Sequence, residues 1–441
     1  MNMQVLSNGL TSLIIRRYVG PFWYCRYWLK KTQKFSKEKL DQLQYVHMRQ
    51  LIAHIERTVP YYQSIFNKIG FTSKEFQTLN DIKRIPILTK QDVLNAGDAI
   101  VSKHYCKQFL RKAHTGGTTG TPLNIYRSIA SIGTEHAFVR RQYDWAGLGL
   151  QDRVAFLTGR VIVPPDQTGG RLYAYDPFMK ELILSTYHLS EITAKDYLKT
   201  ITQYQVKAIA GYPSAVSFLA KVCLDAGKTI PMKAVLTSSE TITDSMRKTI
   251  MQAFSCPVYD FYGSAERVCY IFTCEQGSYH IQPEYGYTEL IPVDETGLCK
   301  IVSTGFWNKA MPFIRYELGD LVIASGKKCS CGRSFPVVES ISGRKADIIK
   351  TPSGREFGAA ILTHLLYGVN HILESQIIQD QIDHLFIDYV PSVEFNSQDM
   401  QSFDYLIKYH LPTELRCEFR KVGAISKTNS GKIRPVISLL K

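Results

Sequence analysis

The run of residues most suggestive of chemistry is HTGGTTGTPL, at positions 114–123. Glycines so close together are unfavourable inside a helix or a strand, so this run is expected to form a loop. Such a loop presents backbone N–H groups and threonine hydroxyls, which are the groups that bind a polyphosphate. It is not the P-loop of the NTPases, because no Gly-Lys-Ser/Thr sequence follows it. A plain Gly/Thr hairpin without a ligand is the alternative.

Four further segments carry residue types that suit a nucleotide site. They are DFYGSAE (260–266), RYELGD (315–320), SGRKAD (342–347) and SKTNSGKIRP (426–435). The first segment places an aromatic ring, a glycine and a carboxylate at the end of a predicted strand. The second offers a carboxylate after a turn, and the last two offer an arginine and a loop lysine. Each signal alone is weak, since a single lysine is usually a solvated surface residue.

The order and spacing of these segments resemble those of the adenylate-forming superfamily of acyl-CoA synthetases and adenylation domains. Within it, the chain is similar to the branch that contains phenylacetate–CoA ligases and the synthetases related to capsular polysaccharide formation. The resemblance starts near Pro60, in VPYYQSIFNKIGF, and ends at Lys432. It covers nearly everything except the first 35 residues.

The resemblance implies a role for each matching residue. Tyr262 would stack on adenine, with Glu240 of the SSET segment nearby, and Glu266 would help to hold Mg²⁺. Asp320 would bind both ribose hydroxyls, with Arg344 beside it. The implied nucleotide-binding residues are Thr115, Gly116, Gly117, Thr118, Thr119, Gly120, Glu240, Tyr262, Gly263, Glu266, Asp320 and Arg344. The implied catalytic residues are Lys432, Glu266 and Thr118, and the implied cofactors are ATP and Mg²⁺.

Two positions depart from the pattern of the family. Many relatives have a lysine after the last glycine of the phosphate loop, where this chain has Thr121. The residue on which the C-terminal domain pivots is often Asp or Lys, whereas this chain has Ala346. Neither change removes an essential group, but both affect what can be expected of the rotation of the C-terminal domain during the reaction cycle.

A second group of residues has the composition of a metal site. Cys274 and His280 are followed by Cys329 and Cys331 in a Cys-Ser-Cys-Gly sequence. One histidine and three cysteines form the ligand set of a closed structural zinc site, and some members of this branch have cysteines at matching places. Four protein ligands leave no open position for water, so catalytic zinc is not expected. The alternative is that all three thiols are free.

Short apolar runs alternate with helical patterns between residues 110 and 340. Examples are VAFLTG (154–159), KAIAGYP (207–213), KAVLTSSE (233–240) and CPVYDFYG (256–263). The alternation predicts an α/β fold with a mostly parallel sheet, whose strand ends would carry the site. The segment 285–325 alternates with period two and predicts antiparallel strands.

Three regions are expected. Residues 1–35 form a basic, aromatic N-terminal segment, 36–344 an adenylation domain with mixed sheets and the ATP and acid pockets, and 345–441 a small, mobile α+β lid domain. The second and third regions together have the architecture of adenylate-forming ligases.

The formal charge of +14 is concentrated near the N-terminus. The first acidic residue is Glu38, and seven basic residues interleaved with aromatic ones precede it. One interpretation is that the aromatic rings pack on the main body while the charges are solvated. Another is peripheral contact with an anionic membrane. Arg16 and Arg17 interrupt the apolar run, so a membrane-spanning segment is not expected, and no nucleic-acid-binding module accompanies the charge.

Ten cysteines without a secretory signal favour a reducing compartment, so the chain is expected in the cytoplasm. A peripheral position at the inner face of the membrane is the alternative. The expected activity is ATP-dependent ligation of a small carboxylic acid through an acyl-adenylate to an amine or hydroxyl acceptor, as in polysaccharide biosynthesis. The alternative acceptor is CoA, and a non-catalytic nucleotide-binding protein is the third hypothesis. The acid pocket would lie among residues 135–160 and 210–265, with His136, His188 and Tyr212 as candidate contacts.

Overall fold

A computed structural model gives the fold of the chain. It describes residues 10–114, 123–160, 162–163, 170–186, 188–293, 295, 297–344, 349–352, 356–357, 369, 371–411, 413–426 and 433–440. The phosphate-loop residues Thr115–Thr121, Ala346 and Lys432 therefore lie outside the described residues.

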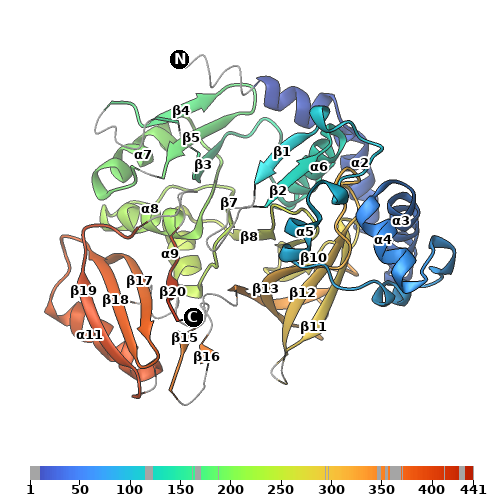
Figure 1. Cartoon of the computed structure of the whole chain (residues 1–441). Helices are drawn as coiled ribbons and strands as arrows, with labels where there is room; N and C mark the ends of the chain where they lie inside the picture. The colour runs from blue at the N-terminus through green and yellow to red at the C-terminus, as the bar shows by residue number, and fades with distance from the viewer. Residues whose placement is uncertain are drawn as a thin grey trace.

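A sheet of 12 strands runs through the larger part of the molecule (Figure 1). Its strands lie in the order β11 (Gly286–Pro292), β12 (Leu298–Gly305), β13 (Tyr316–Ala324), β14 (Val337–Arg344), β10 (Tyr279–Ile281), β9 (Tyr270–Thr273), β8 (Val258–Gly263), β7 (Ala234–Ser238), β6 (Ala208–Gly211), β3 (Val154–Thr158), β5 (Glu181–Ser185) and β4 (Tyr173–Asp176). The sheet is mixed, and the predicted α/β fold is confirmed.

Five neighbouring strands, β8, β7, β6, β3 and β5, pair in parallel. Helices α7 (Glu191–Gln203), α8 (Pro213–Asp225) and α9 (Asp244–Phe254) connect them. Local sequence explains where these helices start, because Pro213 occupies the first turn of α8 and the Thr243 hydroxyl caps α9. The carboxyl ends of parallel strands meet at one edge of a sheet, so the residues after β7 and β8 lie at the same edge.

Alternating side chains of the parallel strands pack on opposite faces. Ile209 and Val235 join a core with α7, α8 and α9. Ala208, Ala210 and Ala234 face the other way and pack near the end of helix α6 (Ile129–Trp145). The small alanines on this second face leave room for α6 to lie close to the sheet.

The N-terminal segment packs on α6. Helix α2 (Phe22–Thr32) buries Phe22, Cys25 and Leu29 in a cluster that includes Phe138 of α6 and Tyr285. This packing supports the first interpretation of the N-terminal aromatic residues. No helix among the described residues is both long enough and apolar enough to cross a membrane.

Helices α3 (Lys37–Thr58), α4 (Pro60–Ile69) and α5 (Lys90–Ala96) pack against the antiparallel part of the sheet. The sequence run IKRIPIL (82–88) predicts a strand before α5, and this prediction is correct only in part. Residues 82–84 belong to a 3-10 helix, Leu79–Arg84, which starts with a capping box of Thr78 and Asp81. Leu88, at the end of the run, forms a parallel bridge with Tyr316. The predicted cap of α5 is correct, since the Thr89 hydroxyl accepts from the backbone N–H of Asp92.

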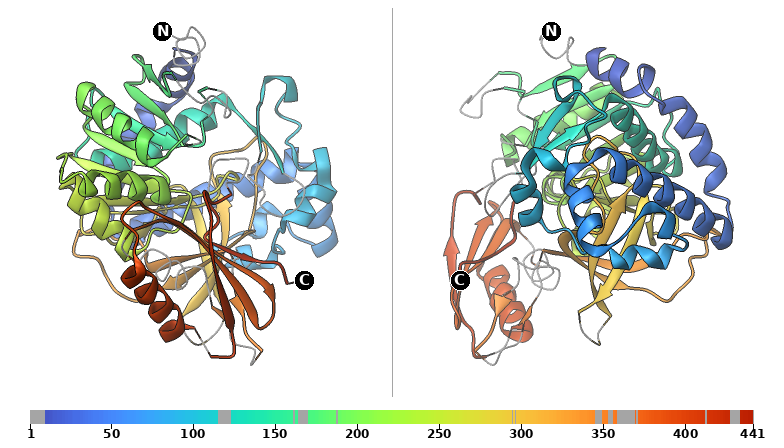
Figure 2. Two further views of the ribbon diagram at one scale, coloured as in Figure 1. Left: turned by 90° about the vertical axis from the view of Figure 1, so that its left-hand side faces the viewer. Right: turned by 45° about the vertical axis from the view of Figure 1, so that its right-hand side comes forward.

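A small C-terminal α+β domain has a sheet of its own (Figure 2). Its strands lie in the order β19 (Arg416–Lys421), β18 (His384–Pro391), β17 (Ile372–Gln381) and β20 (Val436–Ser438), and helix α11 (Ser397–His410) packs on it. Two short strands, β15 (Ile349–Lys350) and β16 (Glu356–Phe357), pair separately. Phe403 and Ile407 of α11 are buried against Ile377 and Ile387. The boundary at 344/345 stays a prediction, because residues 345–348 and most of 358–370 lie outside the described part.

The small domain contacts the region of α8 and α9. Lys221 of α8 donates to the backbone carbonyl of Ile372, the first residue of β17. Met246 of α9 is buried in the core of the small domain. The small domain therefore lies beside the edge of the sheet where β7 and β8 end.

Candidate active site

Tyr262 and Asp320 meet at the edge of the sheet, although they come from different strands. Tyr262 is near the end of β8, and its hydroxyl donates a hydrogen bond of 2.8 Å to Oδ2 of Asp320 on β13. Burial raises the pKa of Tyr262, and the charge of Asp320 raises it further, so the phenol stays protonated. The backbone of Arg344 pairs with that of Asp320 across β13 and β14. Three of the predicted nucleotide-binding positions are thus adjacent.

Glu266 lies on the turn that follows β8. Its Oε1 accepts a hydrogen bond of 3.1 Å from the hydroxyl of Tyr316 at the start of β13. Between Gly263 and Glu266, the hydroxyl of Ser264 is buried and has no hydrogen-bond partner in the part of the chain that the structure describes. A buried hydroxyl without a partner is costly, so this atom suits contact with a bound molecule.

Glu240 joins the large domain to the small one. It follows β7, and its Oε2 accepts a hydrogen bond of 3.1 Å from the backbone N–H of Ser214 in the first turn of α8. Its Oε1 accepts one of 3.2 Å from the backbone N–H of Ile433. Ile433 is the residue after Lys432, so the chain next to the predicted catalytic lysine lies at the predicted adenine pocket.

Two antiparallel strands flank the predicted phosphate loop. β1 (Arg111–His114) pairs with β2 (Asn124–Arg127), with His114 opposite Asn124. Arg127 also donates to the backbone carbonyl of Ala265, which brings the base of this hairpin to the Tyr262–Glu266 turn. The loop itself, with Thr115, Gly116, Gly117, Thr118, Thr119 and Gly120, lies outside the described residues.

Comparison with known proteins identifies this arrangement. A family model described as the CapK C-terminal domain matches residues 349–439. Protein CapK of Staphylococcus aureus is 25% identical over 424 residues, which are 95% of this chain and 94% of that protein. The phenylacetate-coenzyme A ligase of Thermus thermophilus is 24% identical over 351 residues, covering 72% of this chain and 73% of the ligase. The chain is similar to the CapK and phenylacetate-coenzyme A ligase branch of the adenylate-forming superfamily.

Solved structures of this superfamily share the fold. A 2-hydroxyisobutyryl-CoA ligase in its postadenylation state, with an acyl-AMP, superposes with a TM-score of 0.70 at 17% identity and covers 92% of this chain and 90% of its own. The same ligase in its thioesterification state reaches only 0.55. The predicted family and the ATP-dependent class of enzyme are confirmed.

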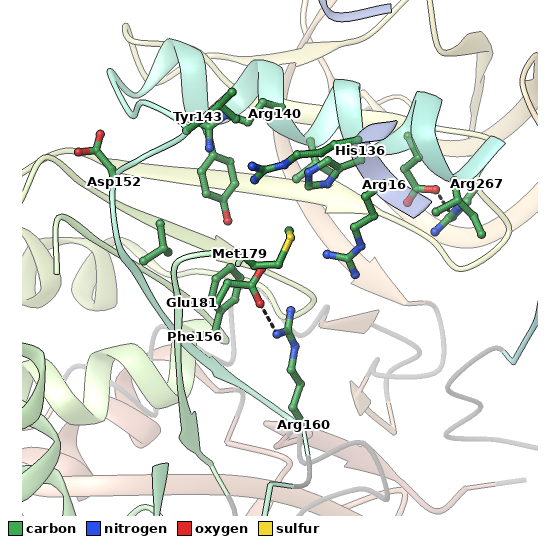
Figure 3. A pocket seen from close by; sticks show the side chains of 16 residues that line it. Arg16, His136, Arg140, Tyr143, Asp152, Phe156, Arg160, Met179, Glu181 and Arg267 are labelled. Atoms are coloured by element: carbon green, nitrogen blue, oxygen red, sulfur yellow. Dashed lines mark hydrogen bonds and ion pairs between the residues drawn. The ribbon is translucent and has the colours of Figure 1, made fainter. Parts of the chain in front are cut away.

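One of the three candidate acid contacts lines a cavity that the structure shows beside α6, and the other two are not part of its wall. His136 on α6 lines a cavity of about 230 Å³ (Figure 3). His188 instead shares a hydrogen bond of 2.6 Å between Nδ1 and Oγ of Ser185. Tyr212 accepts one of 3.1 Å from the backbone N–H of Gly159. The sequence pattern did not identify the arginines that share this cavity with His136, because they come from distant parts of the chain.

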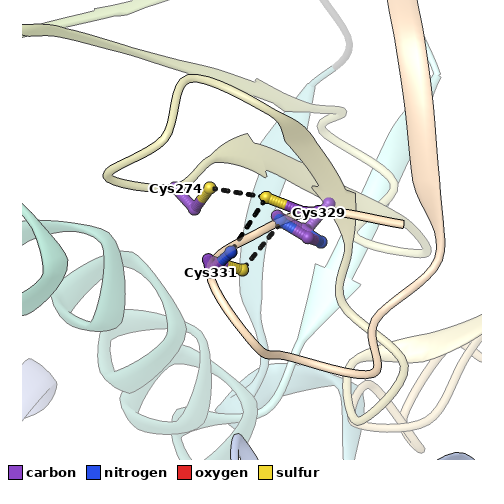
Figure 4. A group of neighbouring side chains, drawn as sticks. Cys274, Cys329 and Cys331 are labelled. Atoms are coloured by element: carbon purple, nitrogen blue, oxygen red, sulfur yellow. Dashed lines mark hydrogen bonds between the residues drawn. The ribbon is translucent and has the colours of Figure 1, made fainter. Parts of the chain in front are cut away.

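The three cysteines and the histidine of the predicted metal site converge beside β9 and β10 (Figure 4). Their ligand atoms all lie within 4.8 Å of one another. The Sγ atoms of Cys274 and Cys329 are 3.6 Å apart, and Sγ of Cys331 is 3.4 Å from Nε2 of His280. In a tetrahedral zinc site with ordinary bond lengths, two sulfurs lie about 3.8 Å apart and a sulfur and a nitrogen about 3.5 Å apart. The cluster thus has the size of a metal site.

The surroundings of the cluster also suit a cation. His280 is fully buried, and its Nδ1 lies 3.4 Å from the backbone carbonyl of Phe335, a contact that orients Nε2 toward the cysteines. Burial raises the pKa of Cys274 to about 12, so its thiol stays protonated at neutral pH without a cation. A coordinated divalent cation stabilises the thiolate instead.

Proposed function

We propose that this chain activates a small carboxylic acid as its acyl-adenylate and transfers the acyl group to an amine or hydroxyl acceptor, in polysaccharide biosynthesis. The observation that carries the proposal is the hydrogen bond between Glu240 and Ile433, because it supports delivery of Lys432 to the nucleotide site. The 25% identity with Protein CapK along nearly the whole chain supports this branch of the superfamily.

The described residues fit ATP and Mg²⁺ at the edge of the sheet. Asp320 would bind the ribose hydroxyls, with Arg344 beside it, and Tyr262 would stack on adenine while its hydroxyl holds the carboxylate of Asp320 in place. The unpartnered hydroxyl of Ser264 is free to contact the nucleotide. Glu266, oriented by Tyr316, would hold Mg²⁺, which supplies positive charge to the phosphates when bound. The loop Thr115–Gly120 would bind the phosphates through its backbone.

The first half-reaction, which forms the acyl-adenylate, brings two negatively charged groups together. A carboxylate oxygen bonds to the α-phosphorus of ATP, and the bond from that phosphorus to the leaving oxygen of pyrophosphate breaks. Two anions must approach, and negative charge builds up on phosphate oxygens. Preorganised N–H groups and a cation stabilise that charge without reorganising, so positioning accounts for most of the catalysis. Lys432 is the cation that the small domain would bring to the reacting atoms.

CoA is the second candidate acceptor. Solved neighbours with the same fold bind an acyl-AMP together with CoA, and the Thermus thermophilus relative is a phenylacetate-coenzyme A ligase. Both hypotheses share the first half-reaction, so only the acceptor separates them. Incubation with ATP, a panel of acids, and either CoA or a mixture of amines and amino sugars distinguishes them by mass spectrometry. The proposal predicts AMP with an amide or ester, and a thioester as the only acyl product would establish the alternative.

We also propose that the Cys274, His280, Cys329 and Cys331 cluster holds structural Zn²⁺. The sulfur and nitrogen donors, the separations of 3.4 and 3.6 Å and the orienting carbonyl of Phe335 support this assignment. The cluster joins the β9–β10 turn to the loop before β14, so a bound ion would fix two segments that no disulfide links.

Peripheral contact with an anionic membrane through residues 1–35 remains a proposal. Tyr18, Trp23, Tyr24 and Tyr27 are exposed on the N-terminal segment, which also carries Lys30 and Lys31. Aromatic rings and basic residues on one outward surface suit the headgroup region of a membrane. Co-sedimentation with vesicles of anionic and neutral lipid tests this, and equal recovery from both would contradict it.

A further inference from the structure

The cavity beside His136 lies where the N-terminal segment meets the large domain. Its wall combines Arg16 and Arg17 with residues of α6, β3 and β5 and with Arg267 (Figure 3). Arg267 directly follows Glu266, the predicted magnesium-binding residue. One end of the cavity is therefore next to the proposed site of adenylation, which places the cavity where the acid substrate would sit.

Positive charge exceeds negative charge in the wall of this cavity. Its arginines are Arg16, Arg17, Arg140, Arg160 and Arg267, and its acids are Glu135, Asp152 and Glu181. Each acid already has a basic partner. Glu181 pairs with Arg160 at 2.5 Å, Glu135 pairs with Arg267, and Asp152 pairs with Lys233 at 2.9 Å.

Arg16 and Arg17 are the arginines without a counter-ion. Neither makes an ion pair or a hydrogen bond through its side chain with any residue that the structure describes. Burial lowers the pKa of both, which is the cost of holding these charges away from water. Two guanidinium groups that lack a direct ion-pair partner at one cavity suit an anion that pairs with them.

Buried polar atoms on the wall also have no partner. They include Nε of Arg17, Nε2 of His136 and Nη1 of Arg267, each without a hydrogen bond in the described chain. Nε of Arg140 and Oε2 of Glu135 also lack a hydrogen bond, but they lie in ion pairs with Asp144 and Arg267. Burial also lowers the pKa of His136 well below its usual range, so its ring is neutral. Unpaired polar atoms are rare in protein interiors, and a group of them around one cavity indicates a ligand that pairs with them.

The fold holds Arg16 and Arg17 in place by unusual local structure. Residues Ile14–Tyr18 form a π-helical turn, closed by a hydrogen bond of 2.9 Å from the N–H of Val19 to the carbonyl of Ile14. Such turns are rare and occur often at functional sites. Just after the turn, Gly20 crosses Gly133 of α6 so closely that a Cβ on Gly133 would lie 3.1 Å from Cα of Gly20. This close backbone contact fixes the segment that carries the two arginines against α6, which forms part of the cavity wall.

We infer that this cavity binds the acid substrate and that Arg16 and Arg17 recognise a second anionic group on it. The inference rests on the proposed function and adds the substrate class, which is a small acid with a second anionic group. The second group is a carboxylate or a phosphate, since both accept hydrogen bonds from guanidinium groups. A volume of about 230 Å³ is below the roughly 300–1,000 Å³ of sites for drug-sized ligands, so the acid is small.

Binding to the full-length protein tests the inference without requiring turnover. Isothermal titration calorimetry compares glutarate with its monomethyl ester, and 3-phosphoglycerate with glycerate, so that each pair differs in the second charge. The first pair tests a carboxylate and the second pair a phosphate. The wild-type protein is expected to bind the member with the second anionic group 10-fold or more tightly in at least one pair. In Arg16→Gln/Arg17→Gln this preference should be lost, because that member loses its buried charged partners while the binding of the other member changes little.

Two further variants separate recognition from folding. Arg16→Lys/Arg17→Lys keeps both charges and should retain much of the preference. Lys195→Gln/Lys199→Gln removes two exposed charges from α7, away from the cavity, and should bind as the wild type does. Melting temperatures establish that every variant is folded. The inference is overturned if the wild type shows no preference in either pair, or if the preference survives in Arg16→Gln/Arg17→Gln.

ATP–pyrophosphate exchange, measured with the same acids, tests the proposed adenylation chemistry separately from the recognition of the second anionic group. Arginine-dependent binding of a dianion without exchange would contradict the adenylation chemistry and leave the recognition intact. Wild-type exchange that is as fast with the acid lacking the second anionic group as with its partner in both pairs, and that is unchanged in Arg16→Gln/Arg17→Gln, would support the chemistry and overturn the substrate class.

Discussion

The backbone N–H of Ile433 lies 3.2 Å from Oε1 of Glu240 and donates a hydrogen bond to it. Glu240 follows β7 in the large domain, and Ile433 belongs to the small domain. A single carboxylate therefore connects the predicted adenine pocket to the segment that carries Lys432. In an enzyme whose small domain moves between two half-reactions, this contact would stabilise the position used for adenylation.

Glu240→Ala should slow adenylation selectively. Hydrogen bonds to charged groups contribute about 1.5–3 kcal/mol, so a loss of about 10- to 100-fold in ATP–pyrophosphate exchange is expected. Acyl transfer from a synthetic acyl-adenylate should change little, because that step does not use this position of the small domain. Glu240→Gln, which keeps a carbonyl oxygen at the same place, serves as the control and should lose less. Equal losses in both half-reactions would contradict the role of this contact.

Purified protein should contain about one zinc per chain by inductively coupled plasma mass spectrometry. Cys329→Ser/Cys331→Ser should lose the metal and melt at a lower temperature, since a structural ion binds the folded state and not the unfolded one. Cys106→Ser is a matched control, because Cys106 is exposed and is not part of the cluster. Wild-type protein that contains no metal as purified and has the same melting temperature as Cys329→Ser/Cys331→Ser would contradict the zinc site.

Gly133→Val should destabilise the protein by about 1–3 kcal/mol, because the added atoms would meet the backbone of Gly20. The measurement is urea unfolding at equilibrium. Gly326→Val is the control, since an added Cβ at Gly326 meets nothing within 4 Å. If Gly133→Val were as stable as the control, the N-terminal segment would not pack on α6 as the structure shows.

His47 should make stability depend on pH between about 6.5 and 4. Burial lowers the pKa of His47 to about 4, and its ring lies 5.4 Å from that of Phe306 and 5.3 Å from that of Trp307. The unfolded chain, with a pKa near 6.5, binds a proton more readily than the folded one. The free energy of unfolding should therefore fall by about 2–3 kcal/mol as the pH drops through this window.

His47→Phe keeps an aromatic ring and removes the titration, so its unfolding free energy should depend less on pH than that of the wild type. Measurement at pH 8 gives the difference in packing alone, and the change from pH 8 to pH 4.5 gives the effect of the proton. Parallel pH profiles for the two proteins would show that His47 is not responsible.

The central strands could be predicted from sequence because each is a short, buried, apolar run ended by a polar residue. Runs at 154–159 and 233–240 correspond to β3 and β7. The strand predicted in IKRIPIL, before α5, forms only in part. The capping box of Thr78 and Asp81 holds the first three residues of this run in a 3-10 helix, whereas Leu88 pairs with Tyr316. Local hydrogen bonding prevailed over apolar composition at the start of the run.

The site was predictable to the extent that its residues lie in short motifs. Tyr262 and Asp320 were expected near one nucleotide, and they share a hydrogen bond. The cavity beside His136 was not predictable in this way, because its arginines, such as Arg16 and Arg160, belong to segments with no common motif. The only signal was that Arg16 and Arg17 interrupt an apolar run, which was used to exclude a membrane-spanning helix and not to suggest a binding site.

ATP–pyrophosphate exchange by the wild type and by Lys432→Ala tests the central claim most directly. With a panel of acids that includes dicarboxylates and phosphorylated hydroxy acids, the wild type should return radiolabelled pyrophosphate to ATP only when an accepted acid is present. Lys432→Ala should lose this exchange by about 100- to 1,000-fold, as expected when one preorganised group is removed from a transition state. It should keep its melting temperature and its binding of ATP, because the sequence predicts that the lysine belongs to a loop of the small domain. Exchange at the wild-type rate in Lys432→Ala, or none with any acid in a folded wild-type protein, would contradict the account.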